Sequence, residues 1–172
     1  LENAMREETR RYFAHVLQQN RSIQDFIDSD YTFLNEPLAR HYGIPGISHQ
    51  EFRQVKLKPE HQRGGLLGHG SVLTATSNGV ETQPVLRGVW ILENLLGTPP
   101  SPPPPDIEPI EPDVRGVSTI RELMEKHRNN ATCFECHRKI DPLGLAMEPY
   151  DFLGRWRDRY AKKIPLNATG HM

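Results

Sequence analysis

Five consecutive residues carry the strongest chemical signal in this sequence: Cys133-Phe134-Glu135-Cys136-His137. Two thiols three positions apart lie on one turn of a helix, where each can add to one vinyl group of a haem. The histidine directly after the second cysteine then lies under the porphyrin and donates a ring nitrogen to the iron. The motif predicts one covalently attached haem c, held by Cys133 and Cys136, with His137 as the proximal iron ligand.

Three other chemistries use two cysteines at this spacing. A structural zinc site needs four ligands, commonly with a second Cys/His pair, and neither His127 nor His171 supplies such a pair. A thioredoxin-like dithiol needs a strand before the motif, whereas a predicted helix and the polar Asn129-Asn130 precede it here. Two unmodified thiols are the remaining alternative. We favour haem attachment over all three.

The occupant of the second axial iron position separates electron transfer from catalysis. Met147 is our first choice, because extended chain spans about 3.3 Å per residue and so reaches round the haem edge from His137. The alternatives are His69, which lies among glycines that permit close approach to a flat group, and Met172. An iron face open to solvent also fits the sequence, and core packing is the alternative role of Met147.

The residues after the motif predict how His137 is oriented. The run Asp141-Pro142-Leu143-Gly144 predicts that the helix ends soon after the motif. We expect the carbonyl of Pro142 to accept the second ring N–H of His137, which would fix its tautomer. Arg87, Arg138 and Arg155 are candidates for pairing with haem propionates.

Periodicity predicts a mainly α domain with long Pro/Gly-rich loops and a small β-hairpin. With the haem motif, this would be a cytochrome c-like helical haem domain. The hairpin is expected to pair a strand near residues 52–57 with residues 63–67. A proline-rich strap in an extended conformation is expected over residues 98–112. Helices are expected over residues 3–20, from Ser22 to Ile27, from Asp30 to Gly43 with a break near Pro37, from Pro84 to Leu96, and from Ser118 to Arg128.

Composition restricts the partners. The chain has 172 residues with 21 basic and 22 acidic side chains, so its balanced charge indicates no binding of nucleic acid. No run approaches the ~20 apolar residues that a membrane span requires. The sequence starts at Leu1 without a leader and ends in what resembles mid-chain sequence. We therefore expect a piece of a longer protein.

Several longer segments resemble a known family. They are Asp30–Glu36, Ala39–Gly43, Arg63–Leu67, Pro84–Pro100 and Cys133–Trp156. Together they resemble the planctomycete-type cytochrome c modules of large secreted multidomain haem proteins, long classed as domains of unknown function. The resemblance implies a helical tail of a preceding module over residues 1–43, a haem module over 44–157, and the start of a following segment over 158–172. It also implies a periplasmic or otherwise extracytoplasmic location.

The leading functional hypothesis is an electron-transfer module whose partners are redox proteins and the rest of a longer chain or complex. It depends on a single haem motif with soft or imidazole ligands and no evident acid–base group. One alternative is a haem enzyme of peroxidase or oxidase type, with an open iron face and a distal base such as His69. Another is a structural or docking subunit of a larger redox complex, which the proline-rich strap would serve.

Overall fold

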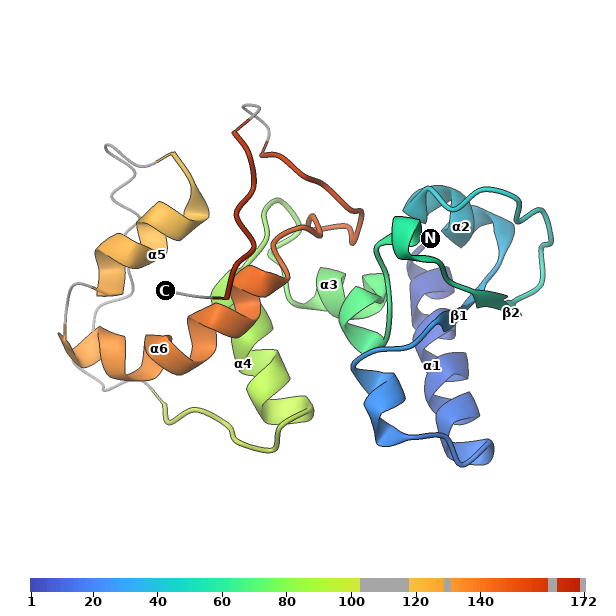
Figure 1. The fold of residues 1–172 in the computed structure, drawn as a ribbon, viewed down its shortest axis with the longest axis horizontal. Helices are drawn as coiled ribbons and strands as arrows, with labels where there is room; N and C mark the ends of the chain where they lie inside the picture. The colour runs from blue at the N-terminus through green and yellow to red at the C-terminus, as the bar shows by residue number, and fades with distance from the viewer. Residues whose placement is uncertain (103–117, 129–130, 161–163, 171–172) are drawn as a thin grey trace. The chain divides into compact units, whose positions relative to one another are not determined.

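The computed structural model describes residues 1–102, 118–128, 131–160 and 164–170, and these residues are mainly helical (Figure 1). The described residues also form a two-stranded antiparallel sheet, so the predicted mainly α class with a small sheet is confirmed. The chain forms two compact units. The N-terminal unit contains Leu1–Thr82 and Tyr150–Arg157, and the motif unit contains Gln83–Pro149 and Asp158–Met172.

The first helix, α1 (Glu2–Gln18), confirms the helix predicted over residues 3–20. Its buried side chains recur every three or four positions and therefore form one face of the helix, made of Met5, Glu8, Tyr12 and Val16. A 3-10 helix over Ile23–Phe26 follows, and the Ser22 side chain caps it by accepting a hydrogen bond from the backbone N–H of Gln24.

The helix predicted from Asp30 is wrong in its first part. Tyr31–Leu34 forms strand β1, and helix α2 begins later, covering Glu36–Tyr42. The side chain of Asn35 accepts a hydrogen bond from the backbone N–H of Leu38 at 3.2 Å, and Pro37 lies in the first turn. Proline is tolerated there because its missing N–H has no helical acceptor. Asn35 and Pro37 therefore set the start of the helix.

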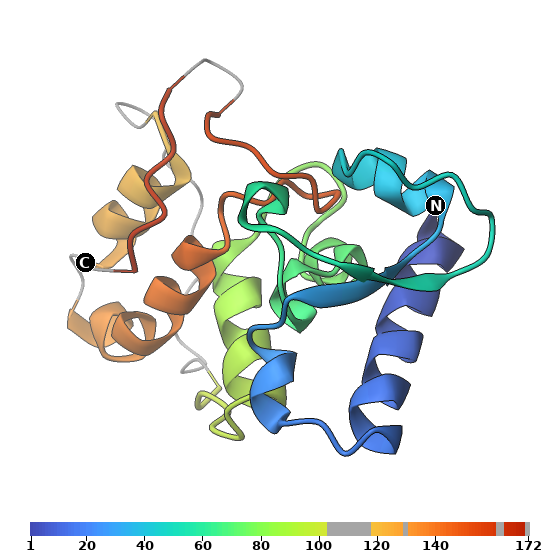
Figure 2. The same ribbon diagram turned by 45° about the vertical axis from the view of Figure 1, so that its right-hand side comes forward.

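Strand β2 (Arg53–Lys56) confirms the strand predicted near residues 52–57, but the predicted pairing is wrong. The partner of β2 is β1, with Tyr31 opposite Lys56. Residues 63–67 contain no strand, and Leu66–Gly68 forms a 3-10 helix. Figure 2 shows the two strands side by side next to α1.

The glycines near His69 allow the chain to approach itself. Gly65 has a φ of +59°, and a Cβ there would lie 2.5 Å from the carbonyl oxygen of Ile27. A Cβ at Gly70, the first residue of helix α3 (Gly70–Ala75), would lie 2.7 Å from the hydroxyl of Tyr42. The close approach expected at these glycines is therefore made by the protein's own atoms.

The segment Tyr150–Arg157 completes the N-terminal unit through Arg63. The Arg63 guanidinium donates hydrogen bonds to the carbonyl oxygens of Gly68 and Gly154. It also lies 3.4 Å from the ring centre of Tyr42 and 5.4 Å from that of Tyr150, as in cation–π contacts. One arginine thus joins three separate parts of the chain within this unit.

The motif unit is built on helices α4 (Pro84–Asn94), α5 (Ile120–Arg128) and α6 (Ala131–Ala146). Helices α4 and α6 pack backbone to backbone at two glycines. A Cβ at Gly88 would lie 2.2 Å from the carbonyl oxygen of Ile140, and a Cβ at Gly144 would lie 1.8 Å from that of Pro84. These contacts fix the position of α6, the helix that carries the cysteines, against α4.

Helix α6 continues through Pro142, so the predicted helix end at Asp141–Gly144 is wrong. A proline inside a helix leaves the carbonyl four positions earlier without its usual donor. That carbonyl belongs to Arg138, which is an exposed residue. Of the predicted proline-rich strap, residues 103–112 lie outside the described residues, and residues 98–102 contain no helix or strand.

Candidate functional site

The cysteines and the histidine of the motif share one face of α6. Cys133, Cys136, His137 and Ile140 are buried or half-buried, whereas Phe134 and the other intervening residues are exposed. This spacing of three, four and seven residues is that of a single helix face. Both cysteines are free thiols. The helix therefore presents two thiols and one imidazole in the same direction.

A cavity of about 420 Å³ lies over this face. Its volume falls within the ~300–1,000 Å³ typical of cofactor and ligand sites. Apolar side chains, thiols, imidazoles and one carboxylate make up most of the wall. The wall contains Val85, Val89 and Glu93 of α4, residues 100–102 of the following loop, His127 of α5, and Thr132, Cys133, Cys136, His137 and Ile140 of α6.

A buried carboxylate orients His137. The imidazole Nδ1 lies 2.8 Å from Oδ1 of Asp141, one turn further along α6, and Asp141 is fully buried. The other carboxylate oxygen lies 3.4 Å from Nε of Arg128. Because the carboxylate accepts the Nδ1–H, Nε2 is the nitrogen with a lone pair available for a metal. The expected orienting role thus belongs to the Asp141 side chain, and the predicted Pro142 carbonyl is wrong as the acceptor.

A second imidazole, which the sequence analysis did not assign to this site, contacts His137. His127 lies in the last turn of α5, with its ring centre 4.8 Å from that of His137 and the two ring planes at 73°. Burial, followed by the nearby His137, lowers the pKa of His127 below its usual value. His127 follows Met124 by three residues, so the two share a face of α5, but helical spacing does not indicate that this face meets the motif.

Met147, the first choice for the distal iron ligand, lies just beyond α6 and is only 4% exposed. Its backbone carbonyl accepts a hydrogen bond from Nη1 of Arg87 at 2.9 Å. The next residue, Glu148, forms an ion pair of 3.8 Å with the same fully buried arginine. Among the described residues of the cavity wall, Met147 does not occur.

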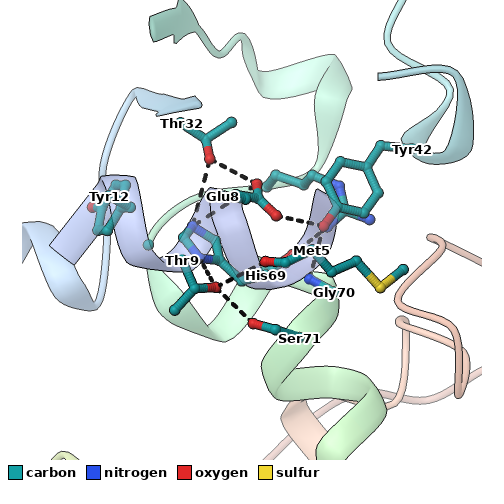
Figure 3. Close-up of polar contacts among 12 residues, drawn as sticks. Met5, Glu8, Thr9, Tyr12, Thr32, Tyr42, His69, Gly70 and Ser71 are labelled. Carbon is teal, nitrogen blue, oxygen red and sulfur yellow. Dashed lines mark hydrogen bonds and ion pairs between the residues drawn. The ribbon is translucent and has the colours of Figure 1, made fainter. Parts of the chain in front are cut away.

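His69, the alternative distal ligand, belongs to a buried polar network in the N-terminal unit (Figure 3). Its Nδ1 lies 2.9 Å from the hydroxyl of Thr9, and its Nε2 lies 3.5 Å from that of Thr32 and 4.0 Å from Glu8. The hydroxyl of Tyr42 donates to the other Glu8 oxygen at 2.6 Å. Both ring nitrogens of His69 therefore face partners inside this unit. Met172, the third candidate, lies outside the described residues.

The three arginines considered for haem propionates all have carboxylate partners. Arg87 pairs with Glu148 in the core, Arg138 pairs with Glu135 at 3.2 Å, and Arg155 pairs with Asp151 at 2.9 Å. Of these arginines, Arg138 belongs to the motif helix and is exposed. The structure therefore brings none of them onto the described cavity wall.

Within the part of the chain that the structure describes, no group of three or more His, Cys, Asp or Glu side chains is arranged to hold a metal ion. None of the described helices has the length and apolar character needed to cross a membrane.

Comparison with known families gives two matches. Residues 63–160 match the model PSCyt3, described as "Protein of unknown function (DUF1588)", and residues 1–44 match PSD4, described as "Protein of unknown function (DUF1592)". These are names of planctomycete-type cytochrome c modules, as the sequence resemblance implied. No curated protein and no solved structure matches the chain. Because the first match spans more than half of its residues, the chain belongs to the DUF1588 family.

Proposed function

We propose that the motif unit binds one haem c covalently through Cys133 and Cys136 and works as an electron-transfer module outside the cytoplasm. The observation that carries this proposal is the 420 Å³ cavity over α6, because both thiols and the His137 imidazole line its wall. The family names agree with a cytochrome-like module. Covalent attachment outside the cytoplasm also agrees with the resemblance to secreted proteins.

The attachment step balances without an oxidant. Each thiol sulfur bonds to one carbon of a haem vinyl group, the thiol hydrogen passes to the other vinyl carbon, and the double bond becomes a single bond. Nothing leaves and no electrons are gained or lost. Cys133 and Cys136 lie one helical turn apart on the cavity wall, so both sulfurs can reach the same edge of a flat ring.

In electron transfer, the protein would hold the haem and orient the histidine that ligates its iron. The bound haem supplies an iron that cycles between the ferric and ferrous states. His137 would ligate through Nε2, and Asp141 holds that imidazole by accepting its Nδ1–H at 2.8 Å. Val85, Val89 and Ile140 line the wall with apolar groups that exclude water. With haem bound, the unit would take one electron from a donor protein and pass it to an acceptor protein.

Expression with haem-attachment machinery and an export signal tests the attachment. The purified protein should carry the mass of one haem, and its colour should survive acidified organic solvent. Cys133→Ala with Cys136→Ala should lose the colour, whereas Glu135→Ala, on the exposed face of the same helix, should keep it. Colour that extracts into the solvent, or no haem in the exported protein, would overturn the proposal. Equal loading without the export signal would contradict the assigned location.

Voltammetry of the loaded protein separates an electron carrier from an enzyme. We expect one reversible one-electron wave that is unchanged when hydrogen peroxide or oxygen is added. A large catalytic current with either oxidant would instead support the peroxidase or oxidase alternative.

A further inference from the structure

We infer that His127 is the second axial ligand of the haem iron, so that the centre is ligated by two histidines. This inference rests on the proposed haem attachment at Cys133 and Cys136. It assigns the distal position to a residue on the cavity wall in place of Met147, the choice made from sequence.

The position of His127 in the structure supports its role as an iron ligand. It lies on the wall of the same cavity as Cys133, Cys136 and His137, although it comes from a different helix. A distal ligand must approach the ring from an element other than the one that carries the proximal histidine, because the two bonds to iron point in opposite directions. Helix α5 provides such an element, and only two residues separate its end at Arg128 from the start of α6 at Ala131.

The second support is the absence of competing partners. Among the described residues, the His127 ring has no hydrogen bond and no ion pair; it packs against the ring of His137. The ring is half-buried, and its nitrogens are not among the buried polar atoms without a partner, so they are open to solvent and available to a metal ion. His69 differs, since its two nitrogens face Thr9 and Thr32. An iron ligand bond would satisfy His127.

The third support is distance. An imidazole nitrogen binds a metal at about 2 Å, so two imidazoles on opposite sides of one iron have ring centres roughly 6 Å apart. The rings of His127 and His137 are now 4.8 Å apart. Seating the iron between them requires an opening on the order of 1 Å, the size of an ordinary helix shift. One ring must also turn, because the two rings now meet edge to face and each must present a nitrogen to the iron.

Met147 is less well placed for this role. Its backbone is held by Arg87, whose Nη1 donates to the Met147 carbonyl and which also pairs with Glu148. Its side chain is 4% exposed and does not occur on the described cavity wall. Bringing its sulfur to the iron would require the side chain to leave this buried position.

Absorption and electron paramagnetic resonance spectra of the haem-loaded chain test the inference. The unaltered protein should be six-coordinate and low-spin, and its reduced form should not bind carbon monoxide. His127→Ala should keep the covalent haem but become high-spin and bind the gas, and added imidazole should restore the low-spin spectrum. Met147→Leu, the matched control, should leave the spectrum unchanged.

A second variant covers the case in which His127→Ala does not fold. His127→Met should stay low-spin and raise the reduction potential, because a thioether stabilises ferrous iron relative to a second imidazole. An unchanged low-spin spectrum in His127→Ala, or a high-spin spectrum in the unaltered protein, overturns the inference while covalent attachment stands. Absence of covalent haem from the unaltered protein overturns the proposed function, and the inference fails with it.

Discussion

Replacing Gly144 with alanine tests whether α4 and α6 touch backbone to backbone. A Cβ at Gly144 would lie 1.8 Å from the carbonyl oxygen of Pro84. Ordinary contact between carbon and oxygen begins at about 3.3 Å, so the helices would have to separate by roughly 1.5 Å. The obstacle is a backbone atom, which cannot rotate away as a side chain can.

The two effects of this substitution have opposite signs. Alanine in place of glycine within a helix stabilises by about 1 kcal/mol, whereas overpacking a tight contact costs about 1–3 kcal/mol. A clash with backbone belongs at the upper end of that range, so we expect the free energy of unfolding to fall by about 2 kcal/mol. Gly88→Ala, whose Cβ would lie 2.2 Å from the Ile140 carbonyl, should behave similarly.

Urea denaturation followed by circular dichroism measures this difference. Leu86→Ala is the matched control, because Leu86 lies in α4 and its side chain is 50% exposed. Its free energy of unfolding should change by less than about 1 kcal/mol. If Gly144→Ala instead raises the stability by the amount that helix propensity alone predicts, the close contact between the helices is refuted.

Three other predictions concern the N-terminal unit. Glu8→Ala should lower the free energy of unfolding by about 2–4 kcal/mol in urea titrations, because it leaves the buried hydroxyls of Tyr42 and Thr32 without their acceptor; an unchanged midpoint would contradict the network. Burial lowers the pKa of His69 below 6.5, so the unfolded chain binds more protons as pH falls below that value. Stability should therefore decrease below pH 6.5, and His69→Gln should flatten that slope; an equal slope in both proteins would refute this assignment. Arg63→Lys keeps the charge but loses the planar guanidinium that contacts two carbonyl oxygens and two tyrosine rings. It should therefore lower the melting temperature by about 2–6 °C, and an unchanged melting temperature would contradict that role.

Local signals predicted the elements that depend on neighbouring residues. Helix α4 followed from Pro84 and the apolar spacing after it, and the motif followed from five adjacent residues. The start of α2 was missed although its signals, Asn35 and Pro37, are local.

Contacts between distant residues were the part that sequence reasoning could not reach. Helix α2 lies between β1 and β2 in the sequence, so the residue pattern of neither strand identifies the other as its partner. The contact between His127 and His137 depends on how α5 packs against α6. The contact between His137 and Asp141 was predictable, since the two residues lie one helical turn apart, but only if the helix continues through Pro142.

The discontinuous composition of the N-terminal unit affects the order in which the chain can fold during synthesis. Its last segment, Tyr150–Arg157, follows 67 intervening residues, Gln83–Pro149, that belong to the other unit. At roughly 5–20 residues per second, a ribosome takes about 3–13 s to make that stretch. Until then Arg63 lacks the Gly154 carbonyl and the Tyr150 ring. The N-terminal unit therefore stays incomplete until the cysteine-bearing helix has been made.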